Sequence, residues 1–184
     1  KAVAKRFTET ELLDLQVWFN LTWFGYIYRS QDPVVKGMIE KGRDFTAEEK
    51  KALLIKQKEI IAKVIPKYRE LMQKGQIEIS VTPFYHPILP LVIDTNSAKE
   101  AIPSITMPAQ RFRHPEDAKY QIESAVNYAR ELFGQAPKGM WPSEGSVSEE
   151  IIPYISSAGI KWIATDEEIL ALSFGRSLSE GRAL

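Results

Sequence analysis

The chain has 184 residues, of which 44% are hydrophobic and 26% are charged, a composition typical of one globular domain or of part of a larger one. Lysine plus arginine number 24, as do aspartate plus glutamate, so the charge balance favours neither a nucleic-acid nor a membrane partner, and a neutral substrate fits better. Cysteine is absent, which excludes disulfides, thiolate metal sites and cysteine nucleophiles.

The ends of the chain give little indication of targeting. No run reaches the roughly 18 apolar residues of a membrane span, and Lys1 to Thr10 has no apolar signal core. The lack of cysteine fits a reducing compartment or a hot habitat, so we expect a cytoplasmic protein. Because the chain begins with Lys rather than Met and reaches Leu184 without an obvious stop, we expect an internal piece of a longer protein.

The first helix is predicted by a capping box, Thr8-x-x-Glu11, and extends to about Arg29. Its apolar residues cover nearly every face, which is typical of a helix that is buried all round. Its aromatic side chains allow a carbohydrate platform, but at helical spacing such residues more often belong to a core. The aromatic residues are Trp18, Phe19, Trp23, Phe24, Tyr26 and Tyr28. Residues 31–44 contain proline and glycine and predict a connection or a short helix.

A second capping box, Thr46-x-x-Glu49, predicts a longer helix that ends at Lys74-Gly75. Pro66 lacks an amide proton, so we expect a kink there. Lysines interleaved with glutamates indicate a solvated face on this helix. Residues 1–74 are therefore expected to form a helical segment.

Residues 75–184 are expected to alternate strands with helices. Apolar and polar residues alternate over 76–82, and further strands are predicted near Lys138–Trp141 and over Ile160–Thr165. A helix is predicted from Pro115 to about Phe133, and Ser146-x-x-Glu149 predicts the start of another. This order indicates parallel strands joined by helical crossovers, so the predicted fold class is α/β.

Trp141 ends the second predicted strand and Glu144 follows it, and in α/β folds the reacting groups lie at the carboxyl ends of strands. Glu144 precedes the predicted cap at Ser146, so the positive end of a helix is expected to favour its ionised form. An ionised carboxylate suits a nucleophile or a stabiliser of an oxocarbenium ion, and Trp141 offers a flat face for a sugar ring. The alternative is a surface glutamate beside a core tryptophan.

Tyr85 and His86 lie in a proline-rich loop after the first predicted strand. Because prolines fix this loop, the ring of His86 is expected to keep one orientation and to hydrogen-bond a substrate hydroxyl, with Tyr85 as a further substrate-binding residue. A histidine packed inside the loop is the alternative. His114 is interpreted as a neighbour of a helix start. Two isolated histidines without metal-ligand spacing predict no metal centre, and no phosphate-binding glycine motif supports nucleotide chemistry.

Asp166 ends the third predicted strand. Adjacent parallel strands lie about 4.8 Å apart, so its carboxylate could approach the separation of roughly 5 to 5.5 Å that retaining glycosidases use between two carboxylates. Alternatively, Asp166 lies in the first turn of a helix opened by Thr165-x-x-Glu168 and interacts with the helix dipole.

Two motifs in this order closely resemble glycoside hydrolase family 57, the retaining enzymes that act on α-glucans. They are Thr82-Pro83-Phe84-Tyr85-His86-Pro87-Ile88-Leu89, preceded by Gly75-Gln76-Ile77-Glu78-Ile79, and Trp141-Pro142-Ser143-Glu144-Gly145-Ser146-Val147-Ser148. Residues 12–20 and 162–167 share the resemblance, so it covers essentially the whole chain.

The resemblance implies part of an incomplete seven-stranded (β/α) barrel, with about three parallel strands and flanking helices in this chain. It implies that Glu144 is the nucleophile, that Trp141 is a subsite wall and that His86 lies near the cleaved bond, where some members carry an acidic residue. The substrate would be an α-glucan or a maltooligosaccharide, and no cofactor is needed. Residues 1–184 would thus be a partial catalytic domain.

Two features of the family are absent from the sequence: an early His-Gln-Pro type strand and the later Asp-Gly-Glu-Asn type segment that supplies the acid/base aspartate. The resemblance therefore implies that Asp166 is not the acid/base, that the remainder of the barrel is a required partner and that this chain alone is inactive. A metal-dependent polysaccharide deacetylase-like enzyme and a noncatalytic glucan-binding domain are the alternatives. Hydrolysis, branching and glucanotransfer share these motifs, so the sequence does not choose among them.

Overall fold

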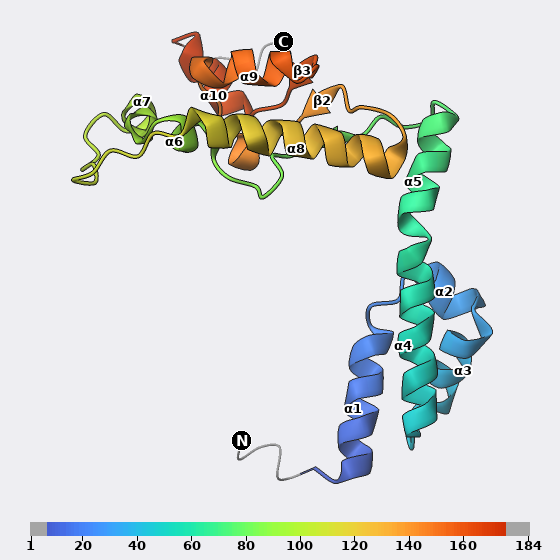
Figure 1. Ribbon diagram of the computed structural model, residues 1–184. Helices are drawn as coiled ribbons and strands as arrows, with labels where there is room; N and C mark the ends of the chain where they lie inside the picture. Colours follow the sequence, from blue (N-terminus) through green and yellow to red (C-terminus); the bar gives the residue numbers. More distant parts are fainter. Residues whose placement is uncertain (1–6, 176–184) are drawn as a thin grey trace. The chain divides into compact units, whose positions relative to one another are not determined.

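A computed structural model describes residues 7–175 of the chain (Figure 1). The chain divides into two compact units, Lys1–Pro66 and Lys67–Leu184, each with its own apolar core. Residues 1–6, which belong to the segment predicted to lack a signal core, and the chain end at Leu184 lie outside the described residues. Within residues 7–175, no helix is both long enough and apolar enough to cross a bilayer.

The first unit is helical. Its helices are α1 (Glu9–Leu21), α2 (Tyr26–Gln31), α3 (Pro33–Lys41) and α4 (Ala47–Ala62). Both predicted capping boxes are confirmed, because the hydroxyls of Thr8 and Thr46 accept hydrogen bonds from the third residue of α1 and α4. The segment predicted as a connection or short helix contains α3, which starts after Asp32, whose carboxylate accepts from the amides of Val34 and Val35.

The prediction of one helix from Thr8 to about Arg29 is wrong, because α1 ends at Leu21 and α2 starts at Tyr26. Gly25 between them has an extended backbone (φ −66°, ψ 162°), which interrupts the helical hydrogen bonds. The expectation of burial on every face is also wrong, since Phe19 and Trp23 are 63% and 73% exposed. The core of this unit consists of Val17, Leu21, Phe24, Val35, Met38, Phe45 and Leu53.

The second predicted helix is present as two pieces, α4 and α5 (Val64–Gln73). The expected kink at Pro66 is confirmed as a break at Lys63, because proline has no amide proton to donate to the carbonyl of Ala62. Gly75, with a positive φ of 67°, ends the helical segment as predicted.

The second unit contains a sheet of three short parallel strands in the order β1 (Ser80–Val81), β2 (Gly139–Met140) and β3 (Trp162–Ile163). Ser80 is in register with Gly139, and Gly139 with Trp162. The three predicted strands and their parallel direction are confirmed, although each pairs over two residues only. Glycine is required in β2, since a side chain at Gly139 would overlap the indole of Trp162.

The second unit also contains helices between and after its strands. They are α6 (Leu89–Ile93), α7 (Ala98–Ala101), α8 (Pro115–Phe133), α9 (Ile152–Ser157) and α10 (Glu167–Ser173), with 3₁₀ turns η2 (Thr95–Ser97), η3 (Ser143–Gly145) and η4 (Glu149–Ile151). The long helix α8 lies beside β1 and joins it to β2 (Figure 1). Its predicted bounds are confirmed, with Pro115 in the first turn and Gly134 in the left-handed cap.

The core of the second unit lies between α8, the sheet and α6, and it also takes residues from η4 and α9. It consists of Leu89, Ile93, Ala118, Ile122, Val126, Met140, Ile151, Ile155 and Ile160. The described chain is therefore a helix-rich α/β structure with three parallel strands, and this core fixes the strand ends from which the candidate site is built.

Candidate functional site

His86 and Glu144 meet at the carboxyl ends of β1 and β2. The His86 Nε2 lies 3.3 Å from the Glu144 Oε1, within hydrogen-bond distance. Their side chains are 49% and 73% exposed, so the pair faces solvent. An exposed pair contributes little to folding stability, and its importance lies in placing an imidazole beside an accessible carboxylate.

Both residues have a left-handed backbone, with φ of 60° at His86 and 54° at Glu144. Residues other than glycine adopt this backbone conformation at a cost of about 1 to 2 kcal/mol. Such strain persists where the surrounding structure holds it, and it concentrates at functional sites. Two strained residues on separate loops, with their side chains in contact, therefore mark this place on the sheet as the candidate site.

The loop of His86 is held by α8. The Tyr85 amide donates to Oε1 of Gln121 over 2.7 Å, and the Phe84 amide donates to the backbone carbonyl of Gln121 over 3.1 Å. Pro83 is fully buried at the base of the loop, and its carbonyl accepts from the His86 amide. The rigid loop expected from its prolines is thus completed by a glutamine from the next helix.

The turn of Glu144 is held from both sides. The Trp141 amide donates to the Val81 carbonyl over 2.8 Å, which joins the start of the turn to β1. The Thr165 hydroxyl donates to the Gly145 carbonyl over 2.7 Å, which joins its end to the chain after β3. Gly145 also has a positive φ of 65°, so Glu144 and Gly145 are two consecutive residues with a left-handed backbone. Glycine adopts this conformation easily because it has no side chain.

The predicted cap at Ser146 is wrong. After the left-handed pair the backbone is extended at Ser146 (φ −73°, ψ 118°), and the next element, η4, starts after Ser148 without a side-chain cap. Glu144 therefore does not precede a capped helix start, because η4 is a three-residue 3₁₀ turn and α9 has six residues.

Aromatic residues lie close to His86 and Glu144 in the sequence. Trp141 is 41% exposed and Tyr85 is 75% exposed, so neither is a core residue. The ring of Phe84 packs edge-on against those of Tyr85 and Tyr128, with centroids 4.8 and 5.6 Å apart. This contact limits the movement of the loop that carries His86.

Asp166 caps α10. Its carboxylate accepts a hydrogen bond from the Ile169 amide over 3.0 Å. Asp166 is therefore the N-cap of α10, one position before the first helical turn in which it was predicted to lie. Thr165, which was predicted to cap this helix, instead contacts Gly145. Of the three candidates at strand ends, His86 and Glu144 have side chains in contact, and the Asp166 carboxylate is engaged by its own helix.

Sequence reasoning missed Gln121 and Thr165, which hold the two loops. Gln121 lies near the buried residues Ala118 and Ile122 of α8. A polar side chain at such a position needs a hydrogen-bond partner, and this could have indicated its role. For Thr165, the sequence predicts only a helix cap.

Asp94 is a buried carboxylate in the second unit that is paired with Arg111. The guanidinium of Arg111 and the Asn96 amide donate to its carboxylate and lower the pKa of Asp94 to about 2, while its burial acts in the opposite direction. Arg113 adds a weaker attraction at 3.9 Å. This pair joins the end of α6 to the segment before α8, so we interpret it as structural. Residues 7–175 contain no group of three or more histidine, cysteine or acidic side chains that could hold a metal.

A parallel sheet with a histidine and an accessible carboxylate at its carboxyl edge is an arrangement found in α/β enzymes. Residues 3–182 match the sequence profile described as Glycosyl hydrolase family 57, and the chain therefore belongs to that family. This confirms the resemblance that the two motifs indicated.

Two curated relatives match about half of the chain. Alpha-amylase 1 of Dictyoglomus thermophilum is 31% identical over 101 residues, and the 4-alpha-glucanotransferase of Thermococcus litoralis is 33% identical over 99 residues. These matches cover 55% and 54% of this chain but 12% of each relative, so the chain spans a small part of their length.

Solved structures give weaker similarity. The alpha-amylase AmyC of Thermotoga maritima is 16% identical with a TM-score of 0.48, covering 90% of this chain and 26% of that one. The family 57 branching enzyme of Thermococcus kodakaraensis, solved with glucose and additives, is 18% identical with a TM-score of 0.46, covering 84% and 26%.

Proposed function

We propose that the intact protein is a retaining glycosidase or transglycosylase that cleaves α-glucosidic bonds in starch- or glycogen-like glucans or maltooligosaccharides. Membership of family 57 and the names of the curated relatives, an alpha-amylase and a 4-alpha-glucanotransferase, support the class of reaction. The observation that carries the proposal is the accessible carboxylate of Glu144, fixed 3.3 Å from the ring of His86.

In the proposed reaction, Glu144 attacks the anomeric carbon and forms a covalent glycosyl intermediate. A second carboxylic acid protonates the leaving oxygen, and water or an acceptor sugar then releases the glycosyl group with retention of configuration. We place this acid/base in a part of the protein outside this chain, since the carboxylate of Asp166 caps α10. Asp166 lies next to the site, and we propose that it contacts the substrate at the edge of the site without taking part in the reaction.

His86 has two roles in the proposal. Its Nε2 fixes one oxygen of the Glu144 carboxylate, which leaves the other oxygen for the attack. We propose that the ring also hydrogen-bonds a substrate hydroxyl. The exposed ring of Trp141 serves as a wall for a sugar ring, and the exposed Tyr85 adds a further contact.

We further propose that the three strands belong to an incomplete seven-stranded (β/α) barrel completed by the rest of the protein. The parallel order of β1, β2 and β3 supports this, because the two outer strands each keep a free edge within the described residues. Location in the cytoplasm stays a prediction.

The test is Glu144→Gln in the full-length protein, with Glu149→Gln as the matched control. Glu149 lies in η4 and is exposed, but it has no place in the site. We expect Glu144→Gln to abolish turnover of maltooligosaccharides and to retain their binding, with Glu149→Gln unchanged. Turnover retained by Glu144→Gln would overturn the assignment. Binding without turnover in the wild-type protein would instead favour a noncatalytic glucan-binding domain, and activity lost only with a chelator would favour the deacetylase-like alternative.

A further inference from the structure

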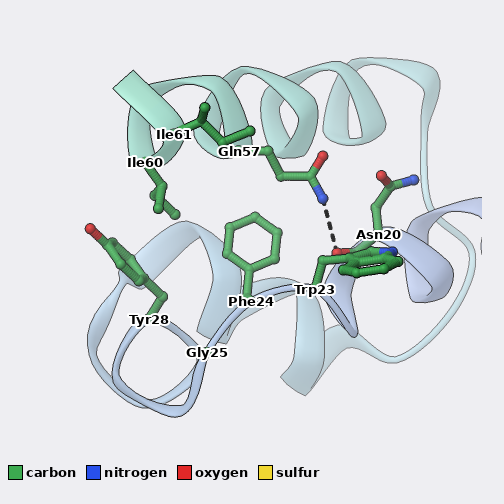
Figure 2. Close-up of a pocket in the computed structure, with 8 residues that line it drawn as sticks. All are labelled: Asn20, Trp23, Phe24, Gly25, Tyr28, Gln57, Ile60 and Ile61. Carbon is green, nitrogen blue, oxygen red and sulfur yellow. Dashed lines mark hydrogen bonds between the residues drawn. The ribbon is translucent and has the colours of Figure 1, made fainter. Parts of the chain in front are cut away.

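The first unit contains a hollow of about 410 Å³ at the junction of α1, α2 and α4 (Figure 2). It lies wholly within residues 20–61, apart from the site of His86 and Glu144 in the sequence. Its lining residues are Asn20, Trp23, Phe24, Gly25, Tyr28, Gln57, Ile60 and Ile61. The hollow results from the interruption between α1 and α2, which turns the chain at Gly25 and leaves the two helices apart.

Three aromatic residues, Trp23, Phe24 and Tyr28, line the hollow, together with the aliphatic side chains of Ile60 and Ile61. Phe24 is 5% exposed and anchors the floor in the core of the unit, whereas Trp23 is 73% exposed. The Trp23 ring packs edge-on against Phe19 with centroids 6.2 Å apart, which restrains its orientation. In Figure 2 the rings of Tyr28 and Trp23 lie on opposite sides of Phe24. The exposed indole of Trp23 presents apolar surface to water, so a ligand that covers it gains binding free energy from burying that surface.

Amide side chains supply the polar part of the hollow. The Gln57 Nε2 donates to the Asn20 carbonyl over 3.1 Å (Figure 2). The Asn20 Nδ2 donates to the Gln16 carbonyl over 2.7 Å. The side-chain oxygens of Asn20 and Gln57 accept no hydrogen bond from residues 7–175, so both can accept from a ligand.

No charged residue lines the hollow, although 26% of the chain is charged. A ligand for it is therefore neutral, with an apolar face for the indole and hydroxyl donors at its edge for the amide oxygens. A sugar ring has this combination, since its C–H face is apolar and its hydroxyls point outward around the ring.

We propose that this hollow binds a neutral oligosaccharide, with Trp23 stacked on a sugar ring and the side-chain oxygens of Asn20 and Gln57 accepting from its hydroxyls. The choice of an α-glucan as the occupant rests on the proposed function.

The experiment is hydroxyl-radical footprinting of the full-length protein, with modification of single residues measured by mass spectrometry. Trp23 is expected to react in the free protein. Maltoheptaose at ten times its Kd fills about nine-tenths of the sites and should reduce the modification rate of Trp23 about tenfold. Tyr26 is 85% exposed and does not line the hollow, so its rate is expected to stay unchanged.

Gln57→Leu gives a second measurement that keeps the volume of the side chain. Losing an acceptor for a substrate hydroxyl should raise the maltoheptaose concentration for half-protection of Trp23 about tenfold. Lys58→Leu is the matched control, because Lys58 lies on α4, is exposed and is outside the lining. An unchanged midpoint in Gln57→Leu would overturn the assigned contact.

Two results overturn the whole proposal: a Trp23 that does not react in the free protein, which would mean that other parts of the protein cover the hollow, or a Trp23 that reacts equally with and without maltoheptaose. The measurement needs no turnover, so Glu144→Gln can be used as the host. Protection at Trp141 without protection at Trp23 overturns only this inference, whereas protection at neither tryptophan also contradicts the proposed substrate.

Discussion

The imidazole of His86 and the carboxylate of Glu144 lie 3.3 Å apart, and each stands on a residue with a left-handed backbone. The two residues are 58 positions apart in the sequence and belong to loops after neighbouring parallel strands. The strain at each position fixes where its side chain leaves the backbone, so the relationship between the two side chains is set by the sheet and by the hydrogen bonds that hold each loop.

The strain at Glu144 predicts a difference in stability between two variants that are both inactive. Glu144→Gly should be more stable than Glu144→Ala by about 1 kcal/mol, because glycine adopts a positive φ without a steric penalty. Both variants should lack turnover. Unfolding midpoints of the full-length proteins, together with maltooligosaccharide assays, check this prediction, and equal stability of the two variants would mean that the backbone at Glu144 is not strained.

His86 is expected to act through the carboxylate. His86→Ala should lower kcat/KM by about ten- to a hundredfold, the loss that corresponds to one hydrogen bond to a charged group. His86→Asn should recover part of this loss, since asparagine tolerates the left-handed backbone and offers a donor. Steady-state kinetics of the full-length variants measure the difference. If His86→Ala keeps wild-type kcat/KM, then the histidine has no part in positioning Glu144.

Gln121 is expected to be a positioning residue for the loop of His86. Gln121→Leu leaves the Tyr85 amide without its acceptor, so it should cost about 1 kcal/mol of stability and should lower kcat more than it raises KM. Glu123→Leu is the control, since Glu123 lies on the exposed face of α8. A loss of stability with wild-type kcat would restrict Gln121 to a purely structural role.

The pair of Asp94 and Arg111 predicts a dependence of stability on pH. The pKa of Asp94 is about 2 in the folded chain, below its usual 3.8, because Arg111 and the Asn96 amide donate to the carboxylate. A lowered pKa means that the ionised form stabilises the fold above pH 4, and that this contribution is lost as the pH falls from about 4 to 2. Asp94→Asn should unfold at a lower temperature at pH 7 and should lose part of the acid dependence in that window. Thermal unfolding between pH 2 and pH 7 tests this, and identical profiles for both proteins would contradict it.

The sequence predicted the elements whose ends have local causes. Helix α8 has the predicted bounds because Pro115 and Gly134 define its ends, and the capping boxes at Thr8 and Thr46 act within one helical turn. The interruption at Gly25 was missed, since the apolar pattern continues across it while the backbone becomes extended. The strands were predicted longer than two residues because pairing depends on neighbours from distant parts of the chain.

The candidate site was predictable only in part. The order of strands and helices indicated that the loops of His86 and Glu144 would lie together, and the contact between their side chains agrees with this. The residues that hold these loops were not predictable from local patterns, because Gln121 and Thr165 act on loops 36 and 20 residues away in the sequence. The left-handed turn at Glu144 likewise displaced the predicted cap at Ser146.

The most direct test of the central claim, that Glu144 is the nucleophile of a retaining glycosidase, is to trap the covalent intermediate. The full-length protein would be treated with an activated fluorinated α-glucosyl substrate that forms the intermediate faster than it is released, and its peptides would be analysed by mass spectrometry. We predict a glycosyl adduct on the peptide that contains Glu144, lost in Glu144→Gln and retained in Glu149→Gln. An adduct on another carboxylate, Asp166 included, would contradict the assignment.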